Sequence, residues 1–319
     1  MIDWKKARVL VTGGGGFLGS HVVEKLRDEG CQPVVARSRD YDLTTEAGAD
    51  RLFAEHAKLD VVFHLAGLVG GIGANKARPA DYFYRNLMMG TLVLDRAWKS
   101  GAKKLVAAGA GCGYPEKAPL PLVESAFWEG FPQKESAPYS LAKRLLSIQS
   151  VAYFQQHQFP SVIGIPGNIY GPYDNFDYEE AHVIPALVRK FVEAADDRLP
   201  RVVVWGSGKP TRDFVYAGDV AEGLLRAADK YDQPSLVNLS SSTETSIRQV
   251  VEALQRLTGF RGEVAWDTAR PDGQARRVFD VSKAERELGW RARTSLEEGL
   301  GKTVEWYRAN RATARNRVA

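Results

Sequence analysis

Tyr139 and Lys143 stand four residues apart in a stretch whose pattern predicts a helix from residue 139 to about residue 156. Residues at this spacing share one helix face, so the phenol and the ammonium lie close together. The ammonium favours the phenolate, and we therefore expect Lys143 to lower the pKa of Tyr139 from its usual value of about 10. Such a tyrosine exchanges a proton with a substrate oxygen near neutral pH. The spacing is common on exposed helix faces, but it becomes informative when a nucleotide site precedes it.

A nucleotide site is predicted near the start of the chain. Residues 8–12 form a β-branched run typical of a buried strand, and a helical pattern begins at His21. Between them, Gly13, Gly16 and Gly19 follow one another at intervals of three residues. Residues without a Cβ let the strand turn tightly and let the backbone approach a pyrophosphate at a helix N-terminus. We therefore predict dinucleotide binding here.

The end of the next predicted strand, at residues 30–36, indicates which dinucleotide is bound. An acidic side chain there would bind a ribose hydroxyl, but this chain has Arg37 and Arg39. A guanidinium suits a 2′-phosphate, so NADP(H) is favoured over NAD(H). In the alternative, both arginines are exposed loop residues and Asp40 binds the ribose of NAD(H). Asp42 resembles a contact to the adenine edge.

The alternation of strands and helices predicts the fold class. After a helix at 48–57, residues 60–66 and 104–108 are continuous apolar runs, and a long helix at 79–99 separates them. Continuous rather than alternating hydrophobicity is typical of a parallel sheet that is covered on both faces. The predicted fold is thus α/β, a Rossmann-type doubly wound parallel sheet with a smaller α/β lobe.

Composition narrows the class of protein. The chain has 319 residues, and its 44% hydrophobic and 26% charged content is ordinary for a globular protein. Its net charge is +4 with basic residues scattered, so nothing favours nucleic acid as a partner. Two cysteines, Cys31 and Cys112, are too few for a disulfide framework or a metal cluster. No run approaches the ~18 apolar residues of a membrane helix. We expect no metal, no membrane contact and a cytoplasmic location.

Motifs along nearly the whole chain match one family. Besides the glycine turn and the Tyr139/Lys143 pair, they include Val-Gly-Gly-Ile at 69–72, Cys-Gly-Tyr-Pro at 112–115, Asn-Ile-Tyr-Gly-Pro at 168–172, His-Val-Ile-Pro-Ala-Leu at 182–187 and Trp-Gly-Ser-Gly at 205–208. On these motifs the chain resembles the extended short-chain dehydrogenase/reductases of the NAD-dependent epimerase/dehydratase family, and within them the GDP-L-fucose synthases. The segments at 69–72 and 182–187 are fairly specific to that branch.

The resemblance implies a division of the chain and an assembly. Residues 1–165 and 216–243 would form an NADP-binding Rossmann domain, and residues 166–215 and 244–319 a nucleotide-sugar-binding lobe. The implied assembly is a homodimer packed through the helices near Asn86 and Tyr139.

The resemblance also implies site residues. Arg212 is expected to meet a diphosphate, and Trp205 to stack on a ring unless it packs in the core. The implied cofactor contacts come from Gly13, Gly16, Phe17, Leu18, Gly19, Arg37, Arg39, Asp42, Leu65, Ala66, Gly67, Tyr139, Lys143 and His182. The implied substrate contacts come from Asn168, Lys190, Trp205, Arg212 and Asp272.

A reaction follows from the same resemblance. The implied substrate is a GDP-linked 4-keto-6-deoxy-hexose, whose ketone acidifies the protons at C3 and C5. Inverting each centre needs an acid and a base, and Cys112 and His182 stand at the positions of that pair. Thiol and imidazole pKa values bracket neutrality, which suits the task. NADPH then reduces C4 while Tyr139 protonates the oxygen and Lys143 holds the phenol and binds ribose. Without the resemblance, Cys112 equally fits a small buried residue and His182 a helix cap.

One position departs from the family pattern. Superfamily members usually carry serine or threonine where this chain has Ala110, and that hydroxyl hydrogen-bonds the reacting oxygen. Losing one such donor commonly costs ~10²–10³ in rate. A water, the backbone N–H of Gly111 or the Cys112 thiol are candidate substitutes. Three hypotheses stay open: an epimerase/reductase with a modified site, an enzyme that only epimerises this or another nucleotide sugar, and a non-catalytic nucleotide-sugar-binding homologue.

Overall fold

The computed structural model describes residues 1–178, 180–270 and 272–314. In this part of the chain, six parallel strands form one sheet in the order β2-β1-β3-β4-β5-β9. The chain leaves β1 toward β2 on one side and continues with β3 on the other, so the carboxyl ends of β1 and β3 flank a topological switch point, where doubly wound sheets bind ligands. The strands are β1 (Val9–Thr12), β2 (Val34–Ala36), β3 (Val61–His64), β4 (Leu105–Ala108), β5 (Ser161–Pro166) and β9 (Ser235–Leu239).

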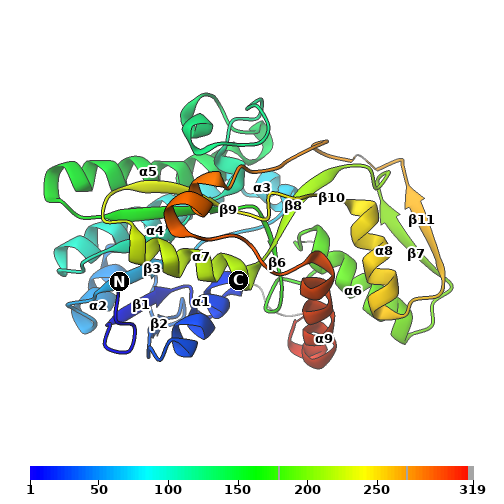
Figure 1. Ribbon diagram of the computed structural model, residues 1–319, viewed down its shortest axis with the longest axis horizontal. Helices are drawn as coiled ribbons and strands as arrows, with labels where there is room; N and C mark the ends of the chain where they lie inside the picture. The colour runs from blue at the N-terminus through cyan, green and yellow to red at the C-terminus, as the bar shows by residue number, and fades with distance from the viewer. Residues whose placement is uncertain (179, 271, 315–319) are drawn as a thin grey trace.

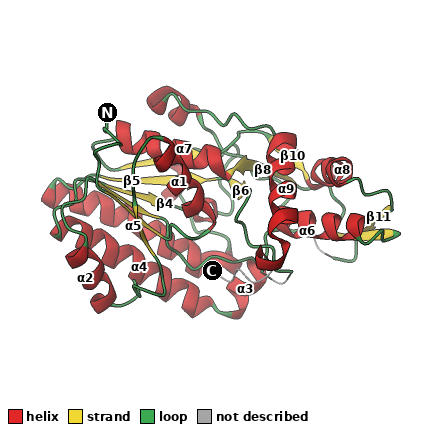
Figure 2. Cartoon of the chain, turned by 90° about the horizontal axis from the view of Figure 1, so that it is seen from below, coloured by secondary structure: helices red, strands yellow, loops and turns green. Residues whose placement is uncertain are grey.

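Helices cover both faces of this sheet, as Figures 1 and 2 show. One face carries α1 (Phe17–Asp28) and α7 (Ala217–Lys230), and the other carries α2 (Glu46–Glu55), α4 (Pro79–Lys99) and α5 (Ala137–His157). Successive strand residues enter different cores: Val9 and Val11 pack on the α1 side, and Leu10 packs on the α2 side. Burial on both faces explains the continuous apolar runs, and the predicted doubly wound parallel sheet is confirmed.

A second group of elements has a core of its own, on the right in Figure 1. The chain crosses to it at Gly167, where an added Cβ would overlap the Ser240 hydroxyl. Tyr170, Phe191 and Leu254 are fully buried in this core. Its elements are a three-stranded sheet of β6 (Asn168–Tyr170), β8 (Thr211–Tyr216) and β10 (Glu244–Ser246), a pair of β7 (Arg201–Trp205) and β11 (Glu263–Asp267), and helices α6 (Val183–Asp196), α8 (Ile247–Thr258) and α9 (Leu296–Ala314).

The chain returns to the main sheet between residues 279 and 290. Phe279 packs in the core on the α2 side, and Leu288 and Trp290 pack in the core on the α1 side. The predicted division into two domains stays a prediction. Residues 279–290, which that division assigns to the nucleotide-sugar-binding lobe, pack on the main sheet. The remaining short elements are α3 (Ile72–Ala77), the 3-10 turns η1 (Gly111–Gly113), η2 (Glu124–Trp128) and η3 (Lys134–Ser136), and the π-helical turn η4 (Ala284–Leu288).

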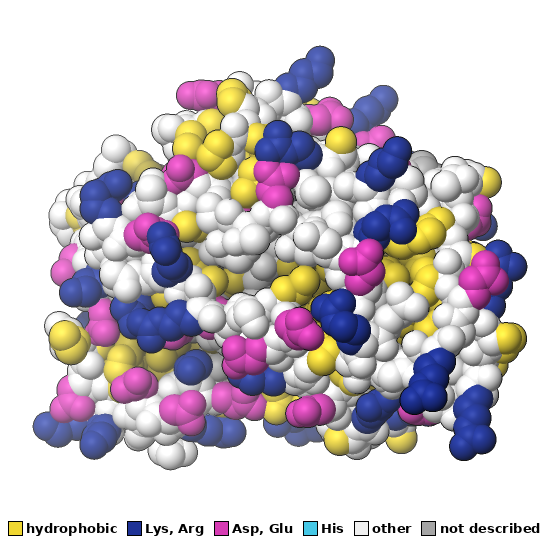
Figure 3. All heavy atoms as spheres, turned by 45° about the vertical axis from the view of Figure 1, so that its right-hand side comes forward, with side chains coloured by type: hydrophobic (Ala, Val, Ile, Leu, Met, Phe, Trp, Pro, Cys, Tyr) yellow, Lys and Arg dark blue, Asp and Glu magenta, His cyan; other side chains and the backbone are white. Residues whose placement is uncertain are grey.

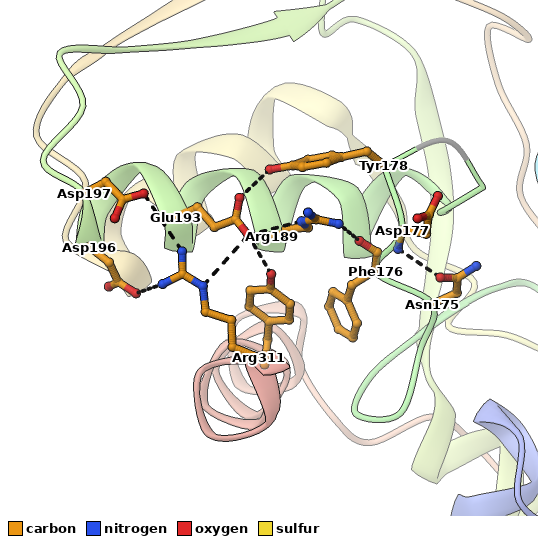
Figure 4. Close-up of polar contacts among 10 residues, drawn as sticks. Asn175, Phe176, Asp177, Tyr178, Arg189, Glu193, Asp196, Asp197 and Arg311 are labelled. Carbon is orange, nitrogen blue, oxygen red and sulfur yellow. Dashed lines mark hydrogen bonds and ion pairs between the residues drawn. The ribbon is translucent and has the colours of Figure 1, made fainter. Parts of the chain in front are cut away.

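A polar network holds the loop that leads into α6 (Figure 4). Glu193 on α6 accepts hydrogen bonds from the Tyr178 hydroxyl at 2.7 Å, the Tyr307 hydroxyl at 3.0 Å and Arg189 Nε at 3.2 Å. Arg189 also donates to the Phe176 carbonyl at 2.9 Å. The loop is thereby tied to the second half of α6 and to α9.

The surface gives no sign of segregated charge on the face drawn in Figure 3, where acidic and basic side chains are interspersed. Among the described residues, no helix combines the length and the apolar character that crossing a membrane requires.

Asp174, in the loop between β6 and α6, is a buried carboxylic acid that is 3% exposed. Its Oδ1 accepts a hydrogen bond from the Asn175 N–H at 2.7 Å, and its Oδ2 has no hydrogen-bond partner among the described residues. Burial raises the pKa of Asp174 to about 8, because the charged form loses its hydration.

We expect Asp174→Asn to stabilise the protein increasingly as the pH rises. Between the unfolded-state pKa of about 4 and the folded-state value of about 8, unfolding of the wild type releases a proton, so its stability falls by up to about 1.4 kcal/mol per pH unit. Asparagine does not titrate and keeps the acceptor for Asn175. Thermal unfolding from pH 5 to 9 should show a gap in Tm that widens to about pH 8 and then stays level. A constant gap would contradict the raised pKa.

Candidate active site

At each of the three predicted glycines, Gly13, Gly16 and Gly19, an added Cβ would crowd the neighbouring backbone. Gly13 has a φ of +70°, and an added Cβ would lie 2.6 Å from the Ala66 nitrogen. At Gly19, a Cβ would overlap the Gly13 carbonyl oxygen, so α1 packs directly on the turn. Gly16 closes the turn, with its N–H bonded to the Gly13 carbonyl at 2.9 Å, and is the N-cap of α1. Gly16 has no side chain to cap α1, which leaves the first N–H groups of the helix, from Phe17 onward, able to bind an anion.

Residues 65–68 connect this turn to Lys143. The Leu65 N–H donates to the Thr12 carbonyl at 3.1 Å, which extends the β1–β3 pairing. A Cβ at Gly67 would lie 3.1 Å from Asn86 Oδ1 and 3.7 Å from Lys143 Nζ. Asn86 holds the next residue, since it accepts from the Leu68 N–H at 3.1 Å and donates to its carbonyl at 3.0 Å.

Tyr139 and Lys143 lie in the first two turns of α5, as predicted. Lys143 is only 9% exposed, and burial lowers its pKa to about 8. The Tyr139 ring packs edge-on against Tyr82, with ring centroids 6.2 Å apart. The expectation that Lys143 lowers the pKa of Tyr139 is wrong. Burial raises the pKa of Tyr139 well above its usual range, and the negative charges that Cys112 and Tyr82 can carry add to the effect.

Cys112 lies in η1, directly after the carboxyl end of β4. Burial raises the pKa of its thiol, whereas a hydrogen bond from Ser140 and the charges of Arg277 and Lys143 oppose that rise. The Cys112 charge in turn acts on the pKa of both Tyr139 and Lys143. The structure therefore brings Cys112, Tyr139 and Lys143 into one group.

His182 belongs to the second group of elements. It is the N-cap of α6 and is exposed, and desolvation of its imidazole by the surrounding structure lowers its pKa. The segment before His182 lies against the two ends of α3. Glu180 pairs with Arg78 at 3.7 Å, and the Glu180 carbonyl oxygen would lie 3.8 Å from a Cβ at Gly71. No hydrogen bond or ion pair joins His182 to Cys112 in the described ranges. Its partnership with Cys112 stays a prediction.

The residues predicted to select the cofactor lie after the carboxyl end of β2. Arg37 and Arg39 are both exposed, and Arg39 pairs with Asp40 at 3.6 Å. Asp42 accepts hydrogen bonds from the Thr44 N–H at 3.0 Å and the Thr44 hydroxyl at 2.6 Å, which lower its pKa. These residues are placed beside β1, where a ribose would lie, but their contacts to a cofactor stay predictions.

Trp205 is a surface residue, so the alternative of core packing is wrong for it. Strand β7 alternates, with Val202 and Val204 buried and Trp205 63% exposed. Arg270 lies over the Trp205 ring at 5.0 Å from its centroid, and Lys190 lies at 6.0 Å. An exposed indole beside two cations can stack on a planar ring of a ligand.

The other predicted substrate residues already have partners within the protein. Lys190 donates to the Val203 carbonyl at 2.8 Å. Asp272 accepts from the Ser207 N–H at 2.6 Å and from its hydroxyl at 2.7 Å. Asn168 begins β6 and is half-buried. Their contacts to a substrate stay predictions.

Arg212 and Arg277 lie near enough for their charges to interact. Arg212 donates to the Thr211 carbonyl at 2.8 Å, and burial and the like charge of Arg277 lower its pKa. Arg277 was not predicted, nor was Ser140, and Asn86 was expected only near a subunit contact. Ser140 directly follows Tyr139, so considering the residues adjacent to the predicted tyrosine would have suggested it. No local sequence pattern marks Arg277.

Comparisons with known proteins identify the family of this chain. The model of the NAD dependent epimerase/dehydratase family matches residues 9–240. The chain belongs to this family. It is 39% identical to the putative GDP-L-fucose synthase 2 of Arabidopsis thaliana, over 96% of this chain and 93% of the relative. It is 34% identical to the GDP-L-fucose synthase of Escherichia coli K12, over 96% and 98%. A crystal structure of a GDP-L-fucose synthetase from Naegleria fowleri bound to NADP aligns with a TM-score of 0.90 at 31% identity, covering 98% and 96%. The predicted resemblance is confirmed.

We expect Gly13→Ala to destabilise the protein by at least about 1 kcal/mol, because alanine is strained at positive φ and its methyl group would collide with Ala66. Gly15→Ala is the matched control, since a Cβ there meets no atom within 4 Å. Denaturant unfolding should separate the two variants. Equal stabilities would contradict the close approach of the turn to Ala66.

Proposed function

We propose that this chain is an NADP(H)-dependent nucleotide-sugar epimerase/reductase of the GDP-L-fucose synthase type. It would invert C3 and C5 of a GDP-4-keto-6-deoxy-hexose and then reduce C4. The observation that carries the proposal is the group of Tyr139, Lys143 and Cys112, which lies beside the 65–68 segment leading from the glycine turn. A proton donor for a carbonyl oxygen and a thiol for C–H chemistry thus occupy one site. Relatives with that name, similar along their full length, support the substrate class.

The residues present fit NADP(H). The cradle formed by Gly13 and the uncapped start of α1 suits a pyrophosphate, and exposed Arg37 and Arg39 suit a 2′-phosphate. A similar structure holds NADP. Bound here, NADP(H) supplies a hydride to the carbonyl carbon. The two cysteines, Cys31 and Cys112, are free thiols, which suits the reducing cytoplasm where we place the protein.

The first prediction of this proposal concerns cofactor choice. NADPH should bind at least about tenfold tighter than NADH, equivalent to about 1.4 kcal/mol, because the arginines pair with the 2′-phosphate. Replacing both Arg37 and Arg39 by alanine should remove the preference, while Arg261→Ala, an exposed arginine in the second group of elements, should keep it. Titration by nicotinamide fluorescence measures both affinities. Equal affinities in the wild type would sink the argument from the arginines.

The proton-transfer groups have suitable resting states. Burial raises the pKa of the Cys112 thiol and desolvation lowers that of His182, so the pair rests as a thiol and a neutral imidazole near pH 7. One member removes a proton from C3 or C5, the electrons move into the ketone as an enolate, and the other returns a proton from the opposite face. Tyr139 keeps its proton at neutral pH because its pKa is raised, and it can give that proton to the C4 oxygen.

Ala110 bears on a second candidate, an enzyme that only epimerises. Ala110 is buried, and its carbonyl accepts the Gly113 N–H at 2.9 Å. Its methyl group offers no hydrogen bond to a carbonyl oxygen. The Cys112 sulfur accepts a hydrogen bond from Ser140, so the S–H of this candidate substitute donor is still available. Charge develops on the C4 oxygen both in the enolate of epimerisation and during reduction, so the missing hydroxyl slows both steps.

Turnover measurements separate these candidates. With a GDP-4-keto-6-deoxy-hexose, we expect slow NADPH oxidation that Tyr139→Phe abolishes and that Ala110→Ser raises about tenfold or more, because the hydroxyl stabilises charge on the oxygen. The double variant with both changes should stay inactive in reduction. Solvent deuterium entering C3 or C5 without NADPH loss, in wild type and Ala110→Ser alike, would establish epimerisation only. Absence of both signals with GDP-, UDP-, CDP- and dTDP-linked ketosugars would leave a binding protein.

We further infer a homodimer packed through α4 and α5. Leu145, Ile148 and Val151 repeat every three residues on α5 and are 36%, 50% and 41% exposed. Leu146, one position on, is buried toward the sheet. Tyr84 on the neighbouring α4 is also exposed, so an apolar stripe faces away from the main sheet on these two adjoining helices. Such stripes mark subunit contacts.

Ile148→Asp should convert the dimer to a monomer, because it places a charge in the middle of the stripe. Leu199→Asp changes an equally exposed leucine in the second group of elements and should leave the assembly intact. Light scattering at micromolar concentration reports the mass. A monomeric wild type would count against the inferred contact.

A further inference from the structure

Arg277 connects two distant parts of the chain next to Cys112. Its Nη2 donates to the Gly111 carbonyl at 2.8 Å, across 166 positions in sequence. Its own carbonyl accepts the Asp213 N–H at 3.0 Å, so its backbone is anchored on β8. The side chain thus links η1, which carries the thiol, to the sheet of the second group of elements.

The turn that Arg277 contacts has little room to relax. A Cβ at Gly111 would lie 2.8 Å from the Phe279 ring and 3.1 Å from the Pro166 carbonyl oxygen. Gly113 closes the turn through its hydrogen bond to Ala110. Gly111 is therefore packed on both sides and held by Arg277 at its carbonyl, and Cys112 follows it directly in the chain.

The Arg277 charge has no carboxylate partner among the described residues. Its Nε is buried and has no hydrogen-bond partner in the same ranges. The charged or titratable groups that act on its pKa are Cys112 and Tyr114, and Arg212 lies near enough to feel its charge. A guanidinium with a buried, unpartnered Nε and no anion beside it is costly, and the thiolate of Cys112 is the first-named of the anions that the protein itself can offer.

We propose that Arg277 is a positioning residue for epimerisation, which holds η1 in place and stabilises the thiolate that Cys112 forms during proton transfer. The assignment rests on the proposed function. Arg212 does not share this role. A Cβ built on Gly273 would lie 3.8 Å from Arg212 Nη2, so the guanidinium lies beside Gly273. Among the described residues, no hydrogen bond joins Arg212 to η1.

Variants separate the hydrogen bond from the charge. Arg277→Lys keeps the charge, Arg277→Gln keeps a donor for Gly111 without the charge, and Arg277→Met removes both. Arg276→Met is the matched control, because Arg276 is exposed and pairs with Glu244 through Nε at 2.9 Å. If Arg277→Met does not fold, the lysine and glutamine variants alone decide.

The first readout is the pH dependence of Cys112 alkylation by iodoacetamide, followed by peptide mass spectrometry to separate it from Cys31. The thiolate is the reactive form, so losing the cation should move the midpoint to higher pH and slow alkylation at pH 8 about threefold or more in Arg277→Gln and Arg277→Met. Arg277→Lys and Arg276→Met should stay near the wild type. An unchanged midpoint in the glutamine variant would overturn the proposal.

The second readout is solvent deuterium exchange into the ketosugar. In Arg277→Gln, we expect kcat for exchange to fall about tenfold or more with KM nearly unchanged, because the defect lies in proton transfer rather than in binding. A raised KM with intact kcat would make Arg277 a phosphate ligand and overturn the positioning role. If wild-type protein shows no exchange, the proposed function fails, and the alkylation series still tests Arg277 by itself.

Discussion

The turn at Gly13 lies so close to the end of β3 that no side chain fits between its backbone and Ala66. This contact fixes where α1 begins, because Gly19 in turn packs on Gly13. It also sets the course of residues 65–68, and Gly67 then passes directly beside Lys143. Movement at the turn would therefore reach the ammonium group through three residues of backbone. The nucleotide turn and the proton-transfer residues form one packed unit, although they lie more than a hundred residues apart in sequence.

The site carries an excess of positive charge, on one buried lysine and two half-buried arginines. Lys143, Arg212 and Arg277 each have a pKa lowered by burial, and none forms an ion pair with a carboxylate in the described ranges. Burying an uncompensated cation costs several kcal/mol. The protein offers one group in return, the Cys112 thiol, whose ionised form interacts with Lys143 and Arg277. Such a site favours negative charge on whatever enters it, as a diphosphate and an enolate both provide.

Sequence patterns predicted the parts of the structure that local rules control. Continuous apolar runs predicted the parallel strands, because both faces of that sheet are covered. The glycine spacing predicted the tight turn, since positive φ at Gly13 and close approach at Gly19 exclude side chains. The four-residue spacing placed Tyr139 and Lys143 on one helix face.

Long-range packing lay beyond these rules. Arg277 meets Gly111 only because residues 279–290 return to the main sheet, and no periodicity encodes that return. The expectation of a lowered Tyr139 pKa fails for a related reason. It considers only an ammonium beside a hydrated phenol, whereas in the fold the phenol is desolvated and feels Cys112 and Tyr82, which can carry negative charge. The exposure of Trp205 follows from the alternating burial of β7, and the run of three valines before it hides that alternation in the sequence.

Ala110 is best understood together with that raised pKa. A phenol that stays protonated is itself a hydrogen-bond donor, so the carbonyl oxygen of a substrate loses one of two donors rather than all of them. The turn after Ala110 is still held by Arg277, Phe279 and the Pro166 carbonyl, so the remaining groups keep their positions. A preorganised donor that survives continues to lower the barrier, whereas a turn free to move would lose that effect too. The physical consequence of the alanine is weaker stabilisation of charge on the C4 oxygen in a site that is otherwise rigidly built. This loss slows reduction at C4 and also the enolate formation on which proton transfer at C3 and C5 depends.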